Sequence, residues 1–226
     1  MSSPLNRAAL VRVVPFALFM ALLALRGTLP DHGGWGVDAR WVYGWAVLLV
    51  GGILLWCWRD YGELAAQMRP DWRETLLAVG IGVLVFVAWI QLDAPWMKLG
   101  NVAAVFRPVD ADGALQWPLI ATRWVGAALV VPVMEELFWR SFLMRWIERA
   151  QFEAVVPQHV GLKALALSTF VFMLAHTLWL AAIIAGLAYA WLYMRTGKLW
   201  VAVIAHAVTN GVLGAWVVVT GNWAYW

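Results

Sequence analysis

The stretch that decides the fold is "VVPVMEELFWRSFLMRW", residues 130–146. Two adjacent glutamates, Glu135 and Glu136, and an arginine, Arg140, interrupt a run of Val, Met, Leu, Phe and Trp. On a helix, Glu136 and Arg140 share a face and can form an ion pair, whereas Glu135 is rotated by about 100° from Glu136. Charged side chains in such an apolar segment need partners or a cavity, so this stretch predicts a buried polar site.

The composition of the whole chain indicates a membrane protein. Of its 226 residues, 64% are hydrophobic and 13% are charged, against about half and a quarter in soluble domains. Its 18 tryptophans fit the same class, because indole rings favour the membrane interface. We therefore expect an integral membrane protein that contacts the lipid bilayer. No basic stripe, zinc-finger spacing or RNP-type aromatic run points to nucleic acid as a partner.

Seven apolar segments approach the length of about 20 residues that a crossing helix needs. They cover residues 13–29, 41–58, 75–92, 117–138, 161–177, 179–194 and 199–219. The first is interpreted as a retained helix, because no small-x-small cleavage site follows it. In the sixth, Ala182, Gly186 and Ala190 indicate close helix packing. The sequence predicts an all-α polytopic membrane helix bundle with about seven to eight transmembrane helices, forming one integral membrane domain over residues 1–226.

The distribution of basic residues predicts the orientation. With alternating helices, eleven of the sixteen Lys and Arg residues fall on the side of the N-terminus and five on the other. The positive-inside rule then places the N-terminus in the cytoplasm. Residues 96–106, "WMKLGNVAAVF", fit an amphipathic helix at the outer interface.

Two further apolar segments carry polar residues. His176 ends the run in "FVFMLAHTLW" (170–179), and His206 and Asn210 lie one turn apart in "WVAVIAHAVTNGVLG" (200–214). Each feature alone has a structural interpretation: a packing histidine, a polar clamp between helices, or, for Glu135 and Glu136, the inner end of a helix. Because polar residues occur on three separate spans, one shared site explains them better than three independent structural roles.

The residue types fit one reaction class. A carboxylate and a histidine can hold and deprotonate a water molecule, and a second histidine and an amide can donate to an oxygen that becomes negative. These are the parts of an amide hydrolase that uses water as its nucleophile. The lack of Gly-x-Ser-x-Gly argues against a serine hydrolase, and Cys57 lies outside the motif-bearing region.

Three motifs carry a family resemblance: Glu-Glu-x-x-x-Arg over 135–140, Phe-x-x-x-His over 172–176 and His-x-x-x-Asn over 206–210. In this order they resemble the CPBP family of intramembrane proteases, named for CaaX proteases and bacteriocin-processing enzymes. The family includes the type II CAAX prenyl endopeptidases and the Abi proteins. The resemblance covers roughly residues 120–215 and divides the chain into N-terminal helices (1–116) and a motif-bearing protease core (117–219). The Trp-rich, loop-poor chain also looks like the branch beside exosortase systems, which implies a bacterial inner membrane.

The resemblance implies a role for each motif residue. Glu135 is similar to the water-activating glutamate, with His176 holding or polarising that water, and His206 and Asn210 look like the oxyanion-stabilising pair. The supporting residues are Glu136, Arg140 and Phe172. The implied function is an intramembrane endopeptidase, without a cofactor, that cuts close to the C-terminus of a membrane-associated substrate with or without a lipid. The implied catalytic cavity lies inside the bundle and opens toward the inner face.

Two alternatives stay open at the level of sequence. Glu135, His176 and His206 form a candidate zinc site of two histidines and one carboxylate, although the compact His-Glu-x-x-His spacing is missing. The chain also fits a non-catalytic membrane protein, such as an immunity factor, that binds a peptide in the same cavity. A transporter is disfavoured by the lack of visible inverted repeats.

The predicted spans leave one mismatch in depth. Glu135 falls toward the inner end of the fourth span, while His176 falls near the outer end of the fifth. A shared site therefore requires one of two changes: the fourth helix continues to about residue 149, or the fifth begins below the membrane surface.

Overall fold

The computed structural model describes residues 6–29, 38–100, 106–110 and 112–226, and in these ranges the chain is helical apart from turns and isolated bridges. The predicted all-α class is confirmed. The α-helices are α1 (Arg7–Thr28), α2 (Val42–Trp56), α3 (Trp72–Gln91), α4 (Trp117–Val125), α5 (Val131–Glu136), α6 (Arg145–Glu148), α7 (Leu162–Leu174), α8 (Trp179–Thr196) and α9 (Leu199–Thr220).

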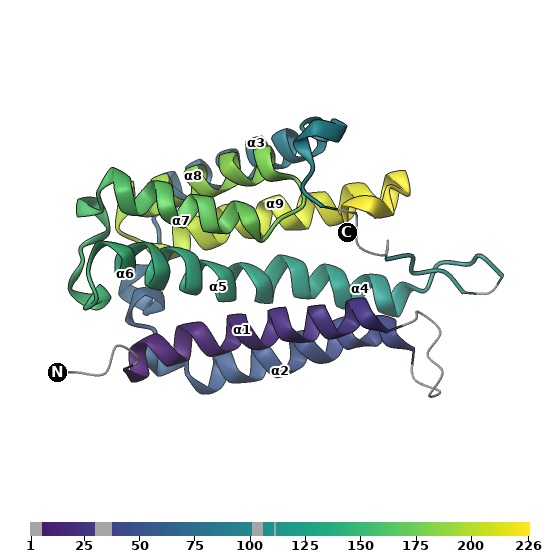
Figure 1. Cartoon of the computed structure of the whole chain (residues 1–226), viewed down its shortest axis with the longest axis horizontal. Helices are drawn as coiled ribbons and strands as arrows, with labels where there is room; N and C mark the ends of the chain where they lie inside the picture. The colour runs from purple at the N-terminus through teal and green to yellow at the C-terminus, as the bar shows by residue number, and fades with distance from the viewer. Residues whose placement is uncertain (1–5, 30–37, 101–105, 111) are drawn as a thin grey trace.

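The helices form a bundle around the continuous helix α4–α6 (Figure 1). The antiparallel pair α1 and α2 lies on one side of it, and α3, α7, α8 and α9 lie on the other. Segments long and apolar enough to cross a membrane are Arg7–Thr28, Ala39–Trp56, Trp72–Gln91, Trp117–Glu148 and Leu199–Thr220. The chain is thus an integral membrane helix bundle, as its composition predicts.

The central helix resolves the mismatch in depth. Predicted over residues 117–138, it runs without a break from Trp117 to Glu148, and the segments 126–130 and 137–144 have the wider π-helical winding. The first of the two alternatives is therefore correct. The sequence estimate ended too early because Arg140, Ser141 and Arg145 look like a solvent-exposed end, whereas all three are buried.

Two expected segments differ in extent from the structure. The fifth span, predicted over 161–177, is a helix only over Leu162–Leu174. The N–H groups of Ala175 and His176 donate to the carbonyls three residues earlier, so the last turn tightens and the chain bends away. The amphipathic helix expected over 96–106 falls in part on residues 101–105, which lie outside the described residues, and Pro95–Met97 form a single 3₁₀ turn.

A buried charge network closes the end of the bundle that carries the N-terminus. Arg12, which is 2% exposed, donates to both oxygens of Glu63 at 2.8 and 2.7 Å. Ser141 donates to the same carboxylate, and Arg145 donates to the Ser141 hydroxyl at 2.8 Å. The network joins α1, the segment after α2 and the central helix. A cavity of about 290 Å³ lies beside it.

The close packing of α3 on α9 depends on Gly82. Its carbonyl accepts a hydrogen bond from Thr209 at 2.8 Å. A Cβ at this position would lie 2.5 Å from the Ala205 carbonyl oxygen and 2.9 Å from the Val208 side chain. The absence of a side chain at Gly82 therefore lets α9 approach α3, and α9 carries two of the predicted site residues.

Gly82→Ala is expected to destabilise the protein by about 1–3 kcal/mol, because the added methyl group overpacks this contact. Gly80→Ala is the matched control on the same helix, since nothing lies within 4 Å of its added Cβ and a helical alanine is favoured over glycine by roughly 0.5–1 kcal/mol. Thermal unfolding of both variants in one detergent checks the difference. Equal melting temperatures would contradict the proposed role of Gly82.

Candidate active site

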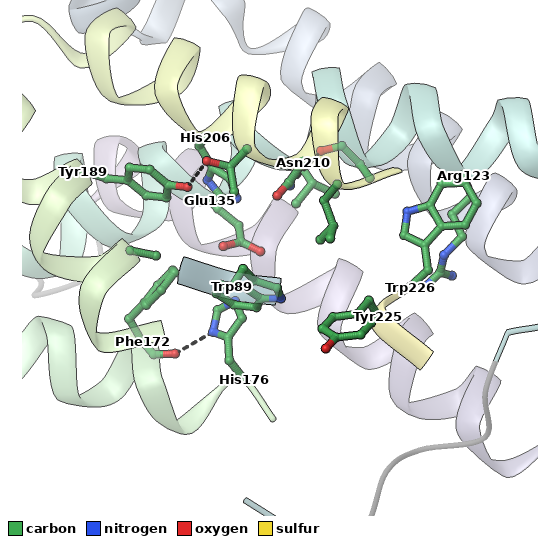
Figure 2. A pocket seen from close by; sticks show the side chains of 15 residues that line it. Trp89, Arg123, Glu135, Phe172, His176, Tyr189, His206, Asn210, Tyr225 and Trp226 are labelled. Carbon is green, nitrogen blue, oxygen red and sulfur yellow. Dashed lines mark hydrogen bonds between the residues drawn. The ribbon is translucent and has the colours of Figure 1, made fainter. Parts of the chain in front are cut away.

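The four predicted catalytic residues line one cavity inside the bundle. The cavity measures about 190 Å³ and lies between the central helix and α3, α7, α8 and α9. Figure 2 shows Glu135, His176, His206 and Asn210 arranged around it, together with aromatic side chains from other elements. Its other lining residues are Trp89, Arg123, Ala127, Val131, Phe172, Ala185, Tyr189, Thr209, Leu213, Tyr225 and Trp226. The geometric expectation of a shared pocket is met.

The two adjacent glutamates have different environments. Glu136 is 0% exposed, and its Oε1 accepts from Arg140 at 3.2 Å and from Nδ1 of His206 at 2.9 Å. Oε2 of each glutamate is buried without a hydrogen-bond partner among the described residues, but only Glu135 lines the cavity. A buried polar atom without a protein partner needs an explanation. The Glu135 oxygen is free to accept a hydrogen bond from a molecule in the cavity.

His176 is held by the segment that follows α7. Its Nδ1 lies 2.8 Å from the carbonyl oxygen of Phe172. A carbonyl can only accept, so Nδ1 carries the proton and Nε2 of the neutral ring is an acceptor. Phe172 also packs its ring against the imidazole with centroids 4.3 Å apart, and Trp89 contacts the ring edge-on at 5.6 Å. The Phe-x-x-x-His spacing therefore fixes both the tautomer and the orientation of His176.

Asn210 is anchored to the π-helical winding of the central helix. Within this winding the Val131 N–H donates to the Gly126 carbonyl, five residues back. The next donor in this pattern would be Pro132, which has no N–H, so the Ala127 carbonyl loses its helical partner. Asn210 Nδ2 donates to this carbonyl at 2.9 Å. One amide hydrogen is used in this way, and the second can donate to a ligand.

Arg140 and Tyr189 support the two histidines. The Arg140 guanidinium lies over the rings of Phe172 and Tyr189, 4.5 and 5.4 Å from their centroids, and donates to the Gly186 carbonyl at 3.3 Å. The Tyr189 ring stacks on His206 at 5.0 Å, and its hydroxyl donates to Thr209 at 2.7 Å. Tyr189 was not predicted as a site residue, because the small residues on its helix indicated packing only.

Metal binding has no support from the arrangement of these side chains. In the described part of the chain, no group of three or more His, Cys, Asp or Glu side chains is placed to hold a metal ion. The alternative zinc set of Glu135, His176 and His206 therefore does not form a ready-made ligand group. Nδ1 of each histidine is already engaged by Phe172 or Glu136.

The position of the cavity mouth corrects one expectation. A second cavity of about 400 Å³ shares Trp89, Arg123, His176, Tyr225 and Trp226 with the first. Its other lining residues include Leu23 and Arg26, near the end of α1 that lies opposite the N-terminus. The mouth therefore lies at the end of the bundle opposite the N-terminus, whereas it was expected on the side of the N-terminus. The cavity at the N-terminal end, which Arg12 and Glu63 line, shares no lining residue with the site.

A comparison with protein families identifies the motif-bearing region. Residues 117–212 match the family model described as type II CAAX prenyl endopeptidase Rce1-like. This region of the chain is Rce1-like. The suspected relationship to the CAAX proteases is thereby confirmed. No curated protein and no solved structure matches the chain.

The Rce1-like match contains every residue of the three motifs, from Glu135 to Asn210. It supports a protease of the CAAX type that acts within a membrane on membrane-associated protein substrates. The first 116 residues lie outside the match, so the division into N-terminal helices and a protease core stays a prediction.

Proposed function

We propose that the chain is an intramembrane endopeptidase that hydrolyses a peptide bond near the C-terminus of a membrane-associated protein, lipidated or not. The observation that carries the proposal is the buried, unpartnered Glu135 oxygen in a cavity that His176 also lines. In a low-dielectric site these two acceptors can hold a water molecule and take up its proton. The Rce1-like match supplies the substrate class.

The proposed reaction uses each residue at one step. Glu135, assisted by His176, accepts a proton from water as the water oxygen bonds to the substrate carbonyl carbon. The carbonyl oxygen becomes negative and receives hydrogen bonds from Asn210 and His206. The proton held by Glu135 then passes to the peptide nitrogen as the C–N bond breaks, giving a carboxylic acid and an amine. Glu136 and Arg140 position His206 and Tyr189 without contacting the substrate.

The orientation is part of the proposal. We infer a bacterial inner membrane with the N-terminus in the cytoplasm, because eleven of the sixteen Lys and Arg residues fall on that side of the bundle. In this orientation the cavity mouth faces the outer surface, since it lies at the end opposite the N-terminus. Single-cysteine variants at Ala8 and Thr220 would test this orientation in intact cells. A reagent that does not cross the membrane should label the cysteine at position 220 and not the one at position 8.

The function is tested with purified protein in lipid nanodiscs. Hydrophobic peptides, with and without a lipid, are incubated with the protein, and the products are identified by mass spectrometry. We expect one cut near the C-terminus, at a rate that a strong chelator leaves unchanged. Loss of activity in chelator, restored by zinc, would favour the metalloprotease. Peptide binding without any cleavage, by protein that is folded, would favour the non-catalytic binder.

A further inference from the structure

Arg123 lies at the mouth of the cavity without an acidic partner. It is a half-buried residue of α4 that lines both the inner and the outer cavity. Among the described residues it forms no ion pair, and its Nε is buried without a hydrogen-bond partner. A charged side chain within a membrane-spanning helix costs about 2.5–3.5 kcal/mol on insertion scales, so such residues are normally paired or functional.

Aromatic rings hold the Arg123 guanidinium in place. It lies over Tyr43, Phe106 and Trp226, at 4.8, 4.5 and 5.8 Å from the ring centroids. Contacts between a cation and aromatic rings do not use up the N–H donors of the guanidinium, so these can still bond to an acceptor. The rings therefore hold the cation without neutralising it.

The charges along the cavity run from negative to positive. Glu135 lies in the inner part, whereas Arg123 also lines the outer part, whose described lining includes no acidic residue. Glu135 and Arg123 are twelve positions apart on one helix, which corresponds to about 18 Å along its axis and to about five residues of extended peptide. A short peptide that ends in an anion fits this gradient.

We propose that Arg123 binds the free α-carboxylate at the C-terminus of the substrate, and that this contact selects chain ends over internal sequences. The proposal rests on the proposed function, which places the scissile bond at Glu135. Arginine suits this ligand because its planar fork can donate two parallel hydrogen bonds to a carboxylate. The released peptide then lies between Glu135 and the mouth. A phospholipid phosphate is the competing anion, but Arg123 also lines the inner cavity that contains Glu135, which favours the peptide.

The test measures binding, so that it does not depend on turnover. A dansylated, N-palmitoylated hexapeptide ending in three apolar residues is prepared as the free acid and as the C-terminal amide. Anisotropy titrations use Glu135→Gln protein in phosphatidylcholine nanodiscs, with Arg123 intact or replaced by Gln or Lys. Arg107→Gln is the matched control, because Arg107 is an exposed arginine in the segment leading to α4 that does not line either cavity.

With Arg123 intact, the acid should bind about 10- to 100-fold more tightly than the amide, as expected for hydrogen bonds to a charged group. The ratio should fall to about one in Arg123→Gln, remain partly in Arg123→Lys and be unchanged in Arg107→Gln. Equal binding of acid and amide with Arg123 intact would overturn the proposal. This comparison needs no variant at Arg123, so it holds even if Arg123→Gln does not fold.

Two further outcomes separate the competing explanations. If Arg123→Gln weakens acid and amide equally, and only in nanodiscs that contain phosphatidylglycerol, Arg123 binds a lipid phosphate and the proposal is wrong. Failure of the proposed function gives a different result. Protein that keeps Glu135 would then cleave neither peptide, but it would still bind the acid more tightly than the amide. If the protein cleaves the acid and the amide at equal rates and binds them equally, the proposed role of Arg123 is wrong and the proposed function stands.

Discussion

Glu135→Gln is expected to lower kcat by roughly 10³-fold, because general-base catalysis typically contributes 10²- to 10⁴-fold. The glutamine keeps the size of the side chain but cannot accept a proton from water. Folding should be little affected, because the lost charge has no ion-pair partner among the described residues. Cleavage of the best peptide from the library, followed by mass spectrometry under single-turnover conditions, measures the effect.

The control for this variant is Glu148→Gln, at the far end of the same helix. Glu148 accepts a hydrogen bond from the Gly161 N–H at 2.9 Å, which a glutamine oxygen can also accept. We expect near-normal activity from it. His176→Ala should lose activity to a similar extent as Glu135→Gln, and the double variant should be little worse than either, since residues that act on one water are not additive. Near-normal cleavage by Glu135→Gln would refute the proposed chemistry.

Of the two contacts of Glu136, one could be predicted from the sequence and the other could not. Its ion pair with Arg140 follows from their four-residue spacing and is present. Its hydrogen bond to His206 joins residues seventy positions apart, and local periodicity says nothing about such a contact. Glu136→Gln should therefore destabilise the fold, because it leaves Arg140 as a buried charge without its partner. The spacing separates the two glutamates by face, and the family resemblance implies that Glu135 is the one in the site. The packing places Glu135, and not Glu136, in the lining of the cavity.

The extent of the central helix was misjudged for a physical reason. Arg140, Ser141 and Arg145 look like a helix end at the membrane surface, and hydropathy cannot tell an exposed arginine from one that a distant glutamate neutralises. Glu63, which pairs with Arg12 and accepts from Ser141, lies 78 positions before that serine. Arg123 was counted as a charge of the outer side, which agrees with its place at the cavity mouth. Its aromatic surroundings could not be predicted, because the rings around it come from separate segments of the chain.

The backbone around Ala127 could not be predicted either. Pro132 is visible in the sequence, and a proline inside a helix predicts a local disturbance. Whether this disturbance is a kink or a wider winding depends on the neighbours. Here the freed Ala127 carbonyl meets the Asn210 amide from α9, so the winding and the site residue stabilise each other.

Asn210→Ala is expected to lower kcat by about 100- to 1000-fold, the usual effect of removing one oxyanion donor. One Asn210 amide hydrogen is already bonded to the Ala127 carbonyl, which points the other toward the cavity. Some loss of stability, roughly 1–3 kcal/mol, should accompany the change because that carbonyl loses its partner. Asn222→Ala, outside the cavity lining, is the control and should have neither effect. Unchanged kcat in Asn210→Ala would remove this residue from the proposed oxyanion site.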